Sequence, residues 1–310
     1  MKTSQTRIKL KPARIIAALA VILMLGGAGV TFVAWATAPR GATVEITEGS
    51  ITGLHESVEL TWPENGEAAI AVGDGTISAN SDHALPMASI SKLITVLMIL
   101  EARPLNPGDQ GPAFEFTYDD ESAYYQAMGA GLSALPVPVG GTLTQHQILE
   151  GILIGSACNY VDYLVYDIWG SNDEFVSAAH SFLQRHNISD ITIVEPTGID
   201  YGNTATPAAL IQVARLALAN PIIAEIVAKR SIELPGVGFV ENTNDLLDDP
   251  GVVGLKTGTL DGYNLLSAKD IVTADGSTVR VFAVVMNQTS DEERFSASRS
   301  LYDQVARFTS

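Results

Sequence analysis

Cysteine is almost absent from this chain, since Cys158 is the only one among 310 residues. No disulfide can form within the chain, so the fold must be held together by its hydrophobic core. Hydrophobic residues make up 46% of the sequence, which is enough for a sizeable core and argues against disorder. Aromatic residues total only 7%, which argues against a broad aromatic binding platform.

Positive charge is also scarce, with 18 lysines and arginines against 35 aspartates and glutamates. The first 40 residues carry six basic side chains and no acid, so residues 41–310 carry a net charge of −23. Binding to nucleic acid needs clustered lysine and arginine, so this acidic body argues against nucleic acid as a partner. We interpret the acidity as a soluble, self-repelling surface rather than as an acidic binding site.

Several site motifs are missing from the sequence. It contains no His-Glu-x-x-His metal motif, no Gly-x-Ser-x-Gly nucleophile turn and no Gly-x-x-x-x-Gly-Lys phosphate loop. The histidines show no metal-ligand spacing, so we expect no metal site and interpret them as core or surface residues. They are His55, His83, His146, His180 and His186.

The N-terminus has the pattern of a membrane anchor. Residues 15–36 carry no charge, and as a helix they would span about 33 Å against a hydrocarbon core of about 30 Å. Basic residues in the preceding segment 1–14 predict that it stays in the cytoplasm. We favour a retained single-pass anchor at the cell membrane, with linker 37–57 leading to an extracytoplasmic body. Cleavage of this segment as a signal peptide is the alternative, and the body would then be secreted.

The body, residues 58–310, shows strand patterns near both ends and helix patterns between them. This order predicts an α+β fold with one antiparallel sheet built from both chain ends and a helical subdomain inserted. Residues 104–143 are rich in glycine and proline and are interpreted as a loop-rich segment covering a cleft. Strands are predicted at 58–62, 68–78 with a turn at 73–75, 252–259, 263–272 and 278–286; helices are predicted at 89–103, from the capping box at 144–147 into residue 156, at 173–186 and 208–219, and after Ser290.

Ser89 and Lys92 form the most informative pair in the sequence. They are three residues apart at the front of a predicted helix, so both side chains lie on one face. A lysine amine beside a serine hydroxyl can take its proton if burial or a neighbouring cation lowers the lysine pKa. Ser-x-x-Lys alone is a weak motif, because a chain of this length contains one by chance about once or less.

Two further segments strengthen this interpretation. Lys256, Thr257 and Gly258 lie in an apolar strand, where glycine lets a substrate backbone come close and lysine can hold a carboxylate. Ser156 and Cys158 lie at the end of an apolar helix. Each segment also has a purely structural interpretation when it is taken alone. The first is then a turn with a surface lysine, and the second is a helix end made of small residues.

Together and in this order, the three motifs resemble the penicillin-binding protein and serine β-lactamase superfamily. Within it the chain looks most like the low-molecular-weight D-alanyl-D-alanine carboxypeptidases. The resemblance covers roughly residues 58–308 and includes the block Glu195-Pro-Thr-Gly198. It implies an exported enzyme that removes the terminal D-alanine from peptidoglycan stem peptides, is acylated by β-lactams and needs no metal or cofactor.

The resemblance also implies a role for each motif. Ser89 would form an acyl-enzyme, Lys92 would be its general base, and Ser156 would pass the proton to the leaving amine. Backbone N–H groups of Ser89 and Thr259 would form the oxyanion hole. Lys256 would lower the pKa of Lys92 and, with Thr257 and Gly258, hold the terminal carboxylate of the substrate.

Cys158 departs from the family pattern, which usually has asparagine at this position. A thiol is a weak donor and a weak acceptor, whereas an amide does both well. Either Cys158 lines the site with weaker support for Lys92, or a local shift turns Asn159 inward; we favour the first. Two rival functions stay open: a serine β-lactamase with Glu195 activating water, and a catalytically weak module that binds wall peptide.

Overall fold

The computed structural model describes residues 43–44 and 58–309. The predicted anchor at 15–36, the basic segment before it and most of the predicted linker lie outside the described residues. Within the described part, no single helix is long and apolar enough to cross a membrane. One pair, α7 (Pro207–Ala219) and α8 (Pro221–Val227), passes by length and composition but is bent by 102°, and both helices contribute buried residues to the core.

A five-stranded antiparallel sheet organises the body, with strand order β12-β13-β14-β3-β4. Its N-terminal strands are β3 (Glu67–Val72) and β4 (Ser78–Ala79), and its C-terminal strands are β12 (Val252–Thr259), β13 (Tyr263–Val272) and β14 (Thr278–Gln288). Strand β14 pairs with β3, which joins the two chain ends in one sheet. The predicted sheet built from both ends is therefore confirmed.

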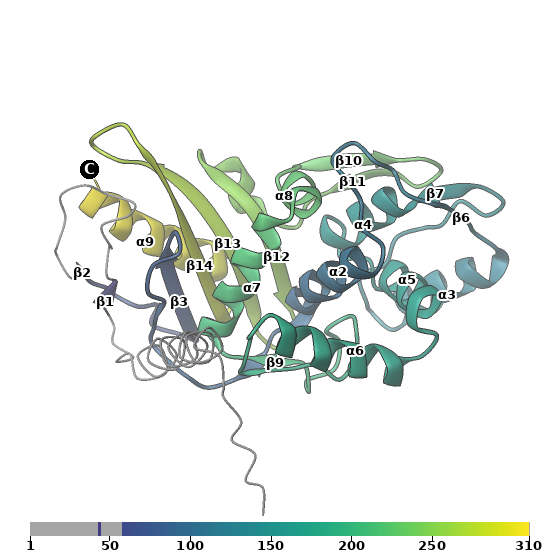
Figure 1. The fold of residues 1–310 in the computed structure, drawn as a ribbon, viewed down its shortest axis with the longest axis horizontal. Helices are drawn as coiled ribbons and strands as arrows, with labels where there is room; N and C mark the ends of the chain where they lie inside the picture. The colour runs from purple at the N-terminus through teal and green to yellow at the C-terminus, as the bar shows by residue number, and fades with distance from the viewer. Residues whose placement is uncertain (1–42, 45–57, 310) are drawn as a thin grey trace, which may run out of the picture. The chain divides into compact units, whose positions relative to one another are not determined.

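Both faces of this sheet are covered by helices (Figure 1). Alternate residues of β14 point to opposite faces: Val281, Ala283 and Val285 join the cluster under α9 (Asp291–Thr309), whereas Phe282 and Val284 join the larger core. Helix α7 packs on that second face, against β3 and β14. The sheet is thereby buried on both sides, and its long apolar runs in β3 and β14 follow from this burial.

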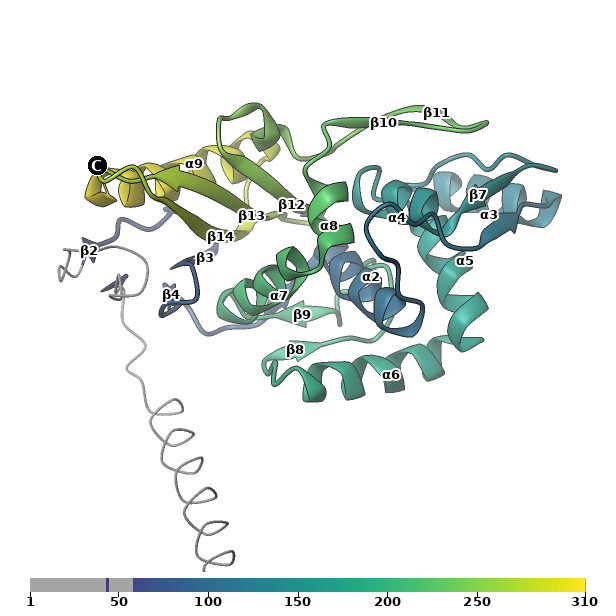
Figure 2. The same cartoon turned by 45° about the horizontal axis from the view of Figure 1, so that its top comes forward.

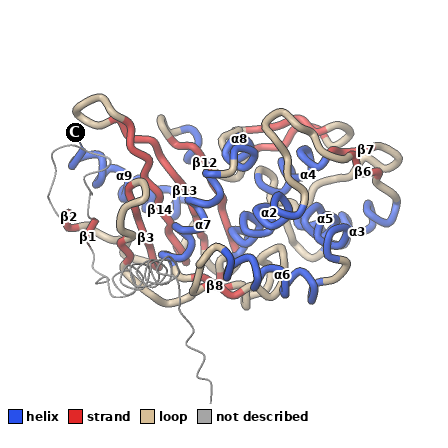
Figure 3. Tube along the Cα trace, in the orientation of Figure 1, coloured by secondary structure: helices blue, strands red, loops and turns tan. Residues whose placement is uncertain are grey.

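Several helices lie between β4 and β12 along the chain, and they surround α2 (Ser91–Ala102) (Figure 2). All residues of α2 from Ser91 to Leu100 are buried, which fits its nearly continuous apolar sequence. Helices α4 (Gln145–Leu153), α5 (Cys158–Trp169) and α6 (Asn172–Arg185) pack around it. Figure 3 shows this helical region beside the sheet, as the predicted inserted subdomain requires.

The predicted helix starts have a physical basis in side-chain caps. Thr144 and Gln147 form a reciprocal capping box at α4, with N···O distances of 2.9 and 3.2 Å. Thr206 accepts a hydrogen bond from the Ala209 N–H at the start of α7, where Pro207 is the first helical residue. Helix α4 ends at Leu153 rather than at the predicted residue 156, because the chain turns before α5.

Residues 104–143 contain more structure than the sequence predicts. They hold β6 (Ala113–Glu115), α3 (Tyr118–Gly129) and the start of β7 (Thr142–Thr144), which pairs with β6. The prediction of a loop-rich segment is wrong for α3, and the reason is physical. None of the residues of α3 is buried, so the helix carries no apolar stripe for a pattern search to detect.

The remaining elements are short. Two of them are 3-10 helices and the others are strands of two to four residues. They are β1 (Thr43–Val44), β2 (Val58–Glu59), β5 (Leu85–Pro86), η1 (Ala88–Ile90), β8 (Ile191–Thr192), β9 (Thr204–Ala205), β10 (Ser231–Leu234), β11 (Gly238–Glu241) and η2 (Asp245–Asp248).

Tyr302 provides a test of how α9 is attached to the sheet. Its hydroxyl lies 2.7 Å from Ser267 Oγ, and both side chains are fully buried. We expect Tyr302→Phe to lower the free energy of unfolding by about 1–3 kcal/mol, because it leaves a buried hydroxyl short of a partner. Urea denaturation measures this, with Tyr118→Phe on the exposed face of α3 as the matched control. Equal stability of the two variants would contradict the attachment.

Candidate active site

Ser89 and Lys92 are brought together where η1 runs into α2. Lys92 is fully buried, Ser89 is half-buried, and Lys92 Nζ lies 2.8 Å from Ser89 Oγ. The preceding residue, Ala88, has a φ of +51°, a conformation that non-glycine residues rarely adopt. Such strain persists only where surrounding contacts hold it, and it is typical of functional sites.

The amine of Lys92 also donates a hydrogen bond to the carbonyl oxygen of Thr197, at 2.7 Å. Burial lowers the pKa of Lys92, and the neighbouring Cys158, Glu195 and Asp162 only partly oppose this shift. The amine therefore loses its proton more readily than an ordinary lysine, which makes it able to accept one from Ser89.

The turn Glu195–Gly198 supports Lys92. The Glu195 carboxylate accepts hydrogen bonds from Thr197 N at 2.7 Å and Gly198 N at 2.5 Å, which folds the turn. A side chain on Gly198, at φ +84°, would collide with the carbonyl oxygen of Ala88. Asn203 is fully buried and donates to Glu195 and to Ser91 Oγ, so it ties the turn to α2.

Strand β12 runs directly beside Ser89. A Cβ atom on Gly258 would lie 2.6 Å from the Met87 carbonyl oxygen, 3.1 Å from Ala88 Cβ and 3.2 Å from Ser89 N. Only glycine fits so close to backbone atoms without a shift. The glycine of the Lys-Thr-Gly motif is thus explained by the close approach of β12 to η1.

Lys256 and Thr257 are both buried on β12. Burial, the charge of Lys92 and the charge of Arg294 together lower the pKa of Lys256 well below its ordinary value. Thr257 Oγ1 lies 2.6 Å from Thr243 Oγ1, which fixes the hydroxyl, and Lys256 Nζ lies 3.3 Å from the Thr257 carbonyl oxygen. The two lysines thus form a pair of buried amines whose charges repel each other.

Ser156 lies in the turn between α4 and α5, buried and at φ +60°. Cys158, at the first position of α5, is buried, and its side chain is close enough to Lys92 to raise the pKa of the amine. Asn159 faces elsewhere: its side-chain amide bonds to the N–H and C=O of Leu135, at 3.1 and 2.8 Å. The structure therefore places the thiol, and not the amide, against the lysine.

Arg294 is a site residue that the motifs do not reveal. It is buried on α9, its Nη1 lies 3.0 Å from Thr259 Oγ1, and its guanidinium stacks on Tyr263 and Phe295. Its Nε has no hydrogen-bond partner among the residues the structure describes. The sequence did hold a signal, because Arg294 shares the helical stripe of Ser298, Leu301 and Val305, where a charge is unexpected.

The described residues hold no group of three or more histidine, cysteine, aspartate or glutamate side chains suited to a metal ion. Two of the histidines contact acidic side chains. His146 is buried between Glu150 and Glu225 in a network with Lys229, and His186 pairs with Glu101.

The fold and this serine–lysine arrangement define a class of protein, the serine hydrolases. A family model described as D-alanyl-D-alanine carboxypeptidase, peptidase S11, matches residues 70–290. The chain therefore belongs to the D-alanyl-D-alanine carboxypeptidase family, which confirms the resemblance stated from its motifs.

Curated relatives agree with this assignment. The chain is 28% identical over 221 residues to D-alanyl-D-alanine carboxypeptidase DacB2 of Mycobacterium tuberculosis. The matched region covers 68% of this chain and 70% of that protein. The chain is 27% identical to D-alanyl-D-alanine carboxypeptidase DacF of Bacillus subtilis, over 69% of this chain and about half, 54%, of that protein.

Solved structures share the fold. The Streptomyces K15 DD-transpeptidase superposes with a TM-score of 0.68 at 21% identity, over 79% of this chain and 98% of that chain. Penicillin-binding protein D2 of Listeria monocytogenes, solved in the ampicillin-bound form, gives a TM-score of 0.63 at 23% identity over 79% of this chain and 98% of that chain. The predicted α+β fold of the penicillin-binding class is thereby confirmed.

Gly258 offers a test of the contact between β12 and η1. We expect Gly258→Ala to lower the free energy of unfolding by about 1–3 kcal/mol, because the new methyl group forces backbone segments apart. The matched control is Gly129→Ala at the end of α3, where a Cβ meets no atom within 4 Å. Thermal and urea denaturation compare the two, and a Gly258→Ala variant as stable as the control would contradict this close packing.

Proposed function

We propose that this protein is an exported serine D,D-carboxypeptidase that removes the terminal D-alanine from peptidoglycan stem peptides. The observation that carries the proposal is the 2.8 Å approach of Ser89 Oγ to the buried amine of Lys92. Membership in the D-alanyl-D-alanine carboxypeptidase family supports the substrate class. The predicted membrane anchor at residues 15–36 is part of the proposal, although it falls outside the described residues.

The reaction begins with acylation of Ser89. Lys92, as the free amine, takes the hydroxyl proton while Ser89 Oγ bonds to the carbonyl carbon of the penultimate D-alanine. The peptide C–N bond then breaks, and Ser156 passes the proton to the departing amine of the last D-alanine. Water attacks the ester in a second step, which releases the shortened peptide and restores the Ser89 hydroxyl.

Backbone N–H groups of Ser89 and Thr259 stabilise the oxyanion that develops in each step. The close packing of Gly258 against η1 supports this, because it brings the end of β12 beside the Ser89 N–H. Losing one such donor typically costs about 2.7–4 kcal/mol of transition-state stabilisation. Thr259 is further oriented by Arg294, whose Nη1 contacts its hydroxyl.

The terminal carboxylate of the substrate binds at Lys256, Thr257 and Gly258. A carboxylate arriving beside Lys256 favours its charged form, which offsets the repulsion that lowers its pKa in the free site. A charged Lys256 in turn favours the uncharged form of Lys92. Substrate binding thus favours the charged form of the lysine that binds and the uncharged form of the lysine that reacts. Penicillins, which also present a carboxylate beside a reactive carbonyl, acylate Ser89 in the same way.

Glu195 favours this function over a β-lactamase on the same fold. A β-lactamase needs a carboxylate free to activate water for rapid deacylation, whereas the Glu195 carboxylate already accepts bonds from Thr197 and Gly198. A chromogenic cephalosporin separates the two functions: slow, one-for-one acylation supports the carboxypeptidase, and rapid turnover supports the β-lactamase.

Ser89→Ala tests the nucleophile. We expect this variant to lose labelling by a fluorescent penicillin and release of D-alanine from a peptide ending in D-Ala-D-Ala. The control is Ser296→Ala, an exposed serine on α9, which should retain both activities. Equal labelling of the two variants would assign the acylation to another residue. Wild-type protein that is labelled but releases no D-alanine would instead identify a penicillin-binding module without peptidase activity.

Lys256→Gln tests the coupling between the two buried lysines. Acylation requires the free amine of Lys92, so its rate rises with pH through the pKa of that residue. The repulsion between the two ammonium groups is mutual, so removing the Lys256 charge raises the pKa of Lys92 and moves this rise to higher pH. Rates of penicillin acylation measured from about pH 5 to 10 give the profile. The profile should not move in Lys269→Gln, a half-exposed lysine on β13, and an unmoved profile in Lys256→Gln would contradict the coupling.

A further inference from the structure

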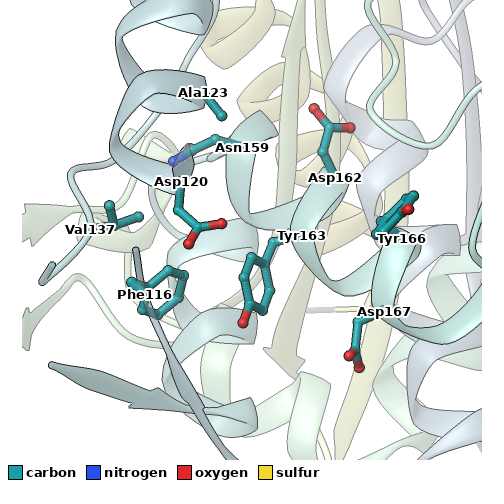
Figure 4. A pocket seen from close by; sticks show the side chains of 9 residues that line it. All are labelled: Phe116, Asp120, Ala123, Val137, Asn159, Asp162, Tyr163, Tyr166 and Asp167. Atoms are coloured by element: carbon teal, nitrogen blue, oxygen red, sulfur yellow. The ribbon is translucent and has the colours of Figure 1, made fainter. Parts of the chain in front are cut away.

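Two cavities outside the serine–lysine motifs differ in the state of their buried polar groups. The larger, of about 560 Å³, lies between α3 and α5 (Figure 4). Its buried amide, on Asn159, is already hydrogen-bonded to the N–H and C=O of Leu135. The smaller, of about 260 Å³, lies between the β10–β11 hairpin and η2, and the buried side chain of Asn244 lines it.

Asn244 holds an unused hydrogen-bond donor. The residue is 2% exposed, and its Oδ1 caps η2 by accepting a hydrogen bond from the Leu246 N–H at 3.2 Å. Its Nδ2 has no hydrogen-bond partner among the residues the structure describes. A buried donor without a partner is costly, so a ligand oxygen that accepts from Nδ2 gains binding free energy there.

The β10–β11 hairpin presents one of its faces to this cavity. Ser231 pairs with Glu241 across the hairpin, and Phe239 lies two residues before Glu241 on the same face. All three line the cavity, whereas Val240, on the opposite face, is buried in the core. Phe239 is 64% exposed. Its ring is therefore a free surface, and the negative face of an aromatic ring attracts the C–H groups of a ligand that stacks on it.

The charges that line the cavity disfavour an anionic ligand. Three carboxylates, those of Glu241, Asp245 and Asp248, line it together with one cation, Arg230. Arg230 is already paired with Asp248, at 2.9 Å. The oxygen that accepts from Asn244 should then belong to a neutral amide or hydroxyl group, and further hydroxyl groups of the same ligand can donate to the carboxylates.

The cavity lies directly behind a segment that supports the proposed carboxylate site. Asn242 and Asn244 line the cavity, whereas the hydroxyl of Thr243, between them, lies 2.6 Å from Thr257 Oγ1 on β12. One short stretch of chain thus contacts both the cavity and the substrate-binding strand. A ligand in the cavity and a peptide beside Thr257 can therefore belong to the same polymer.

We propose that this cavity binds one N-acetylated sugar ring of the glycan strand to which peptidoglycan stem peptides are attached. The ring stacks on Phe239, and its acetamido oxygen accepts a hydrogen bond from Asn244 Nδ2. The volume of about 260 Å³ lies just below the range of about 300–1,000 Å³ that is typical of small-ligand pockets, which suits a single ring. The identity of the polymer rests on the proposed function, whereas sugar binding itself is measured without catalysis.

Two soluble tetrasaccharides test the subsite. One is the β-1,4-linked tetramer of N-acetylglucosamine, and the other is the β-1,4-linked tetramer of glucose, which lacks acetamido groups. Saturation-transfer difference NMR on the full-length protein, in a detergent that carries no sugar, gives Kd for each. We expect the acetylated tetramer to bind about three- to tenfold more tightly, the size of one hydrogen bond. In Asn244→Asp, which keeps the oxygen that caps η2 but loses the N–H donor, this ratio should fall to about one.

Phe239→Ala tests the stacking surface. We expect it to raise Kd for both tetramers by about three- to tenfold, whereas Tyr118→Ala, which removes an exposed aromatic side chain from α3, should change neither. No saturation transfer from the wild-type protein, equal Kd values for Phe239→Ala and wild type, or a preference retained in Asn244→Asp would overturn the subsite. Sugar binding as expected without release of D-alanine from a peptide ending in D-Ala-D-Ala would support the subsite and overturn the proposed peptidase function.

Discussion

The amine of Lys92 lies in complete burial, 2.8 Å from a serine hydroxyl, and the rest of the site depends on that burial. A charged ammonium is costly in such surroundings, so the pKa falls and the amine becomes able to accept a proton. Lys92 is buried because it lies on α2, whose residues are buried at the centre of the helical region. A lysine on the first turn of such a helix has no route to solvent, and its amine is hydrogen-bonded by Ser89 and the Thr197 carbonyl instead of by water.

This burial explains why the neighbouring segments approach so closely. The turn with Gly198 presses against Ala88 from one side, and Gly258 of β12 presses against Met87 and Ser89 from the other. Each glycine occupies a place where a side chain would strike backbone atoms. Ala88, whose backbone φ is strained, takes part in both contacts. The cost of that conformation, of order 1–3 kcal/mol, is offset by the packing on both sides, which fixes the nucleophile in position.

Much of this was predictable from the sequence, and the exceptions share a cause. Strands β12 and β13 match their predicted bounds, because long apolar segments buried in a sheet have a clear pattern. The motifs at Ser89 and Lys256 were visible because the chemistry requires those residue types at those places. Helix α3 was missed because it buries nothing, and the place of Cys158 against Lys92 depends on the turn at Ser156, whose positive φ no periodicity reveals. Arg294 contacts Thr259 across 35 residues of chain, a relation that only the folded structure creates.

The presence of a cysteine at position 158 changes which groups support the Lys92 amine. An asparagine at this place could both donate to and accept from its neighbours, whereas a thiol does each only weakly. Asn159 does not compensate, because its amide is committed to the backbone of Leu135. The strong neutral partner of the Lys92 amine, besides Ser89, is thus the Thr197 carbonyl. The turn held by Glu195 and Asn203 consequently has a greater share in orienting the base than it would beside an amide, since it positions that carbonyl. The acidic groups nearby, Glu195 and Asp162, then act on Lys92 through their charge rather than through contact.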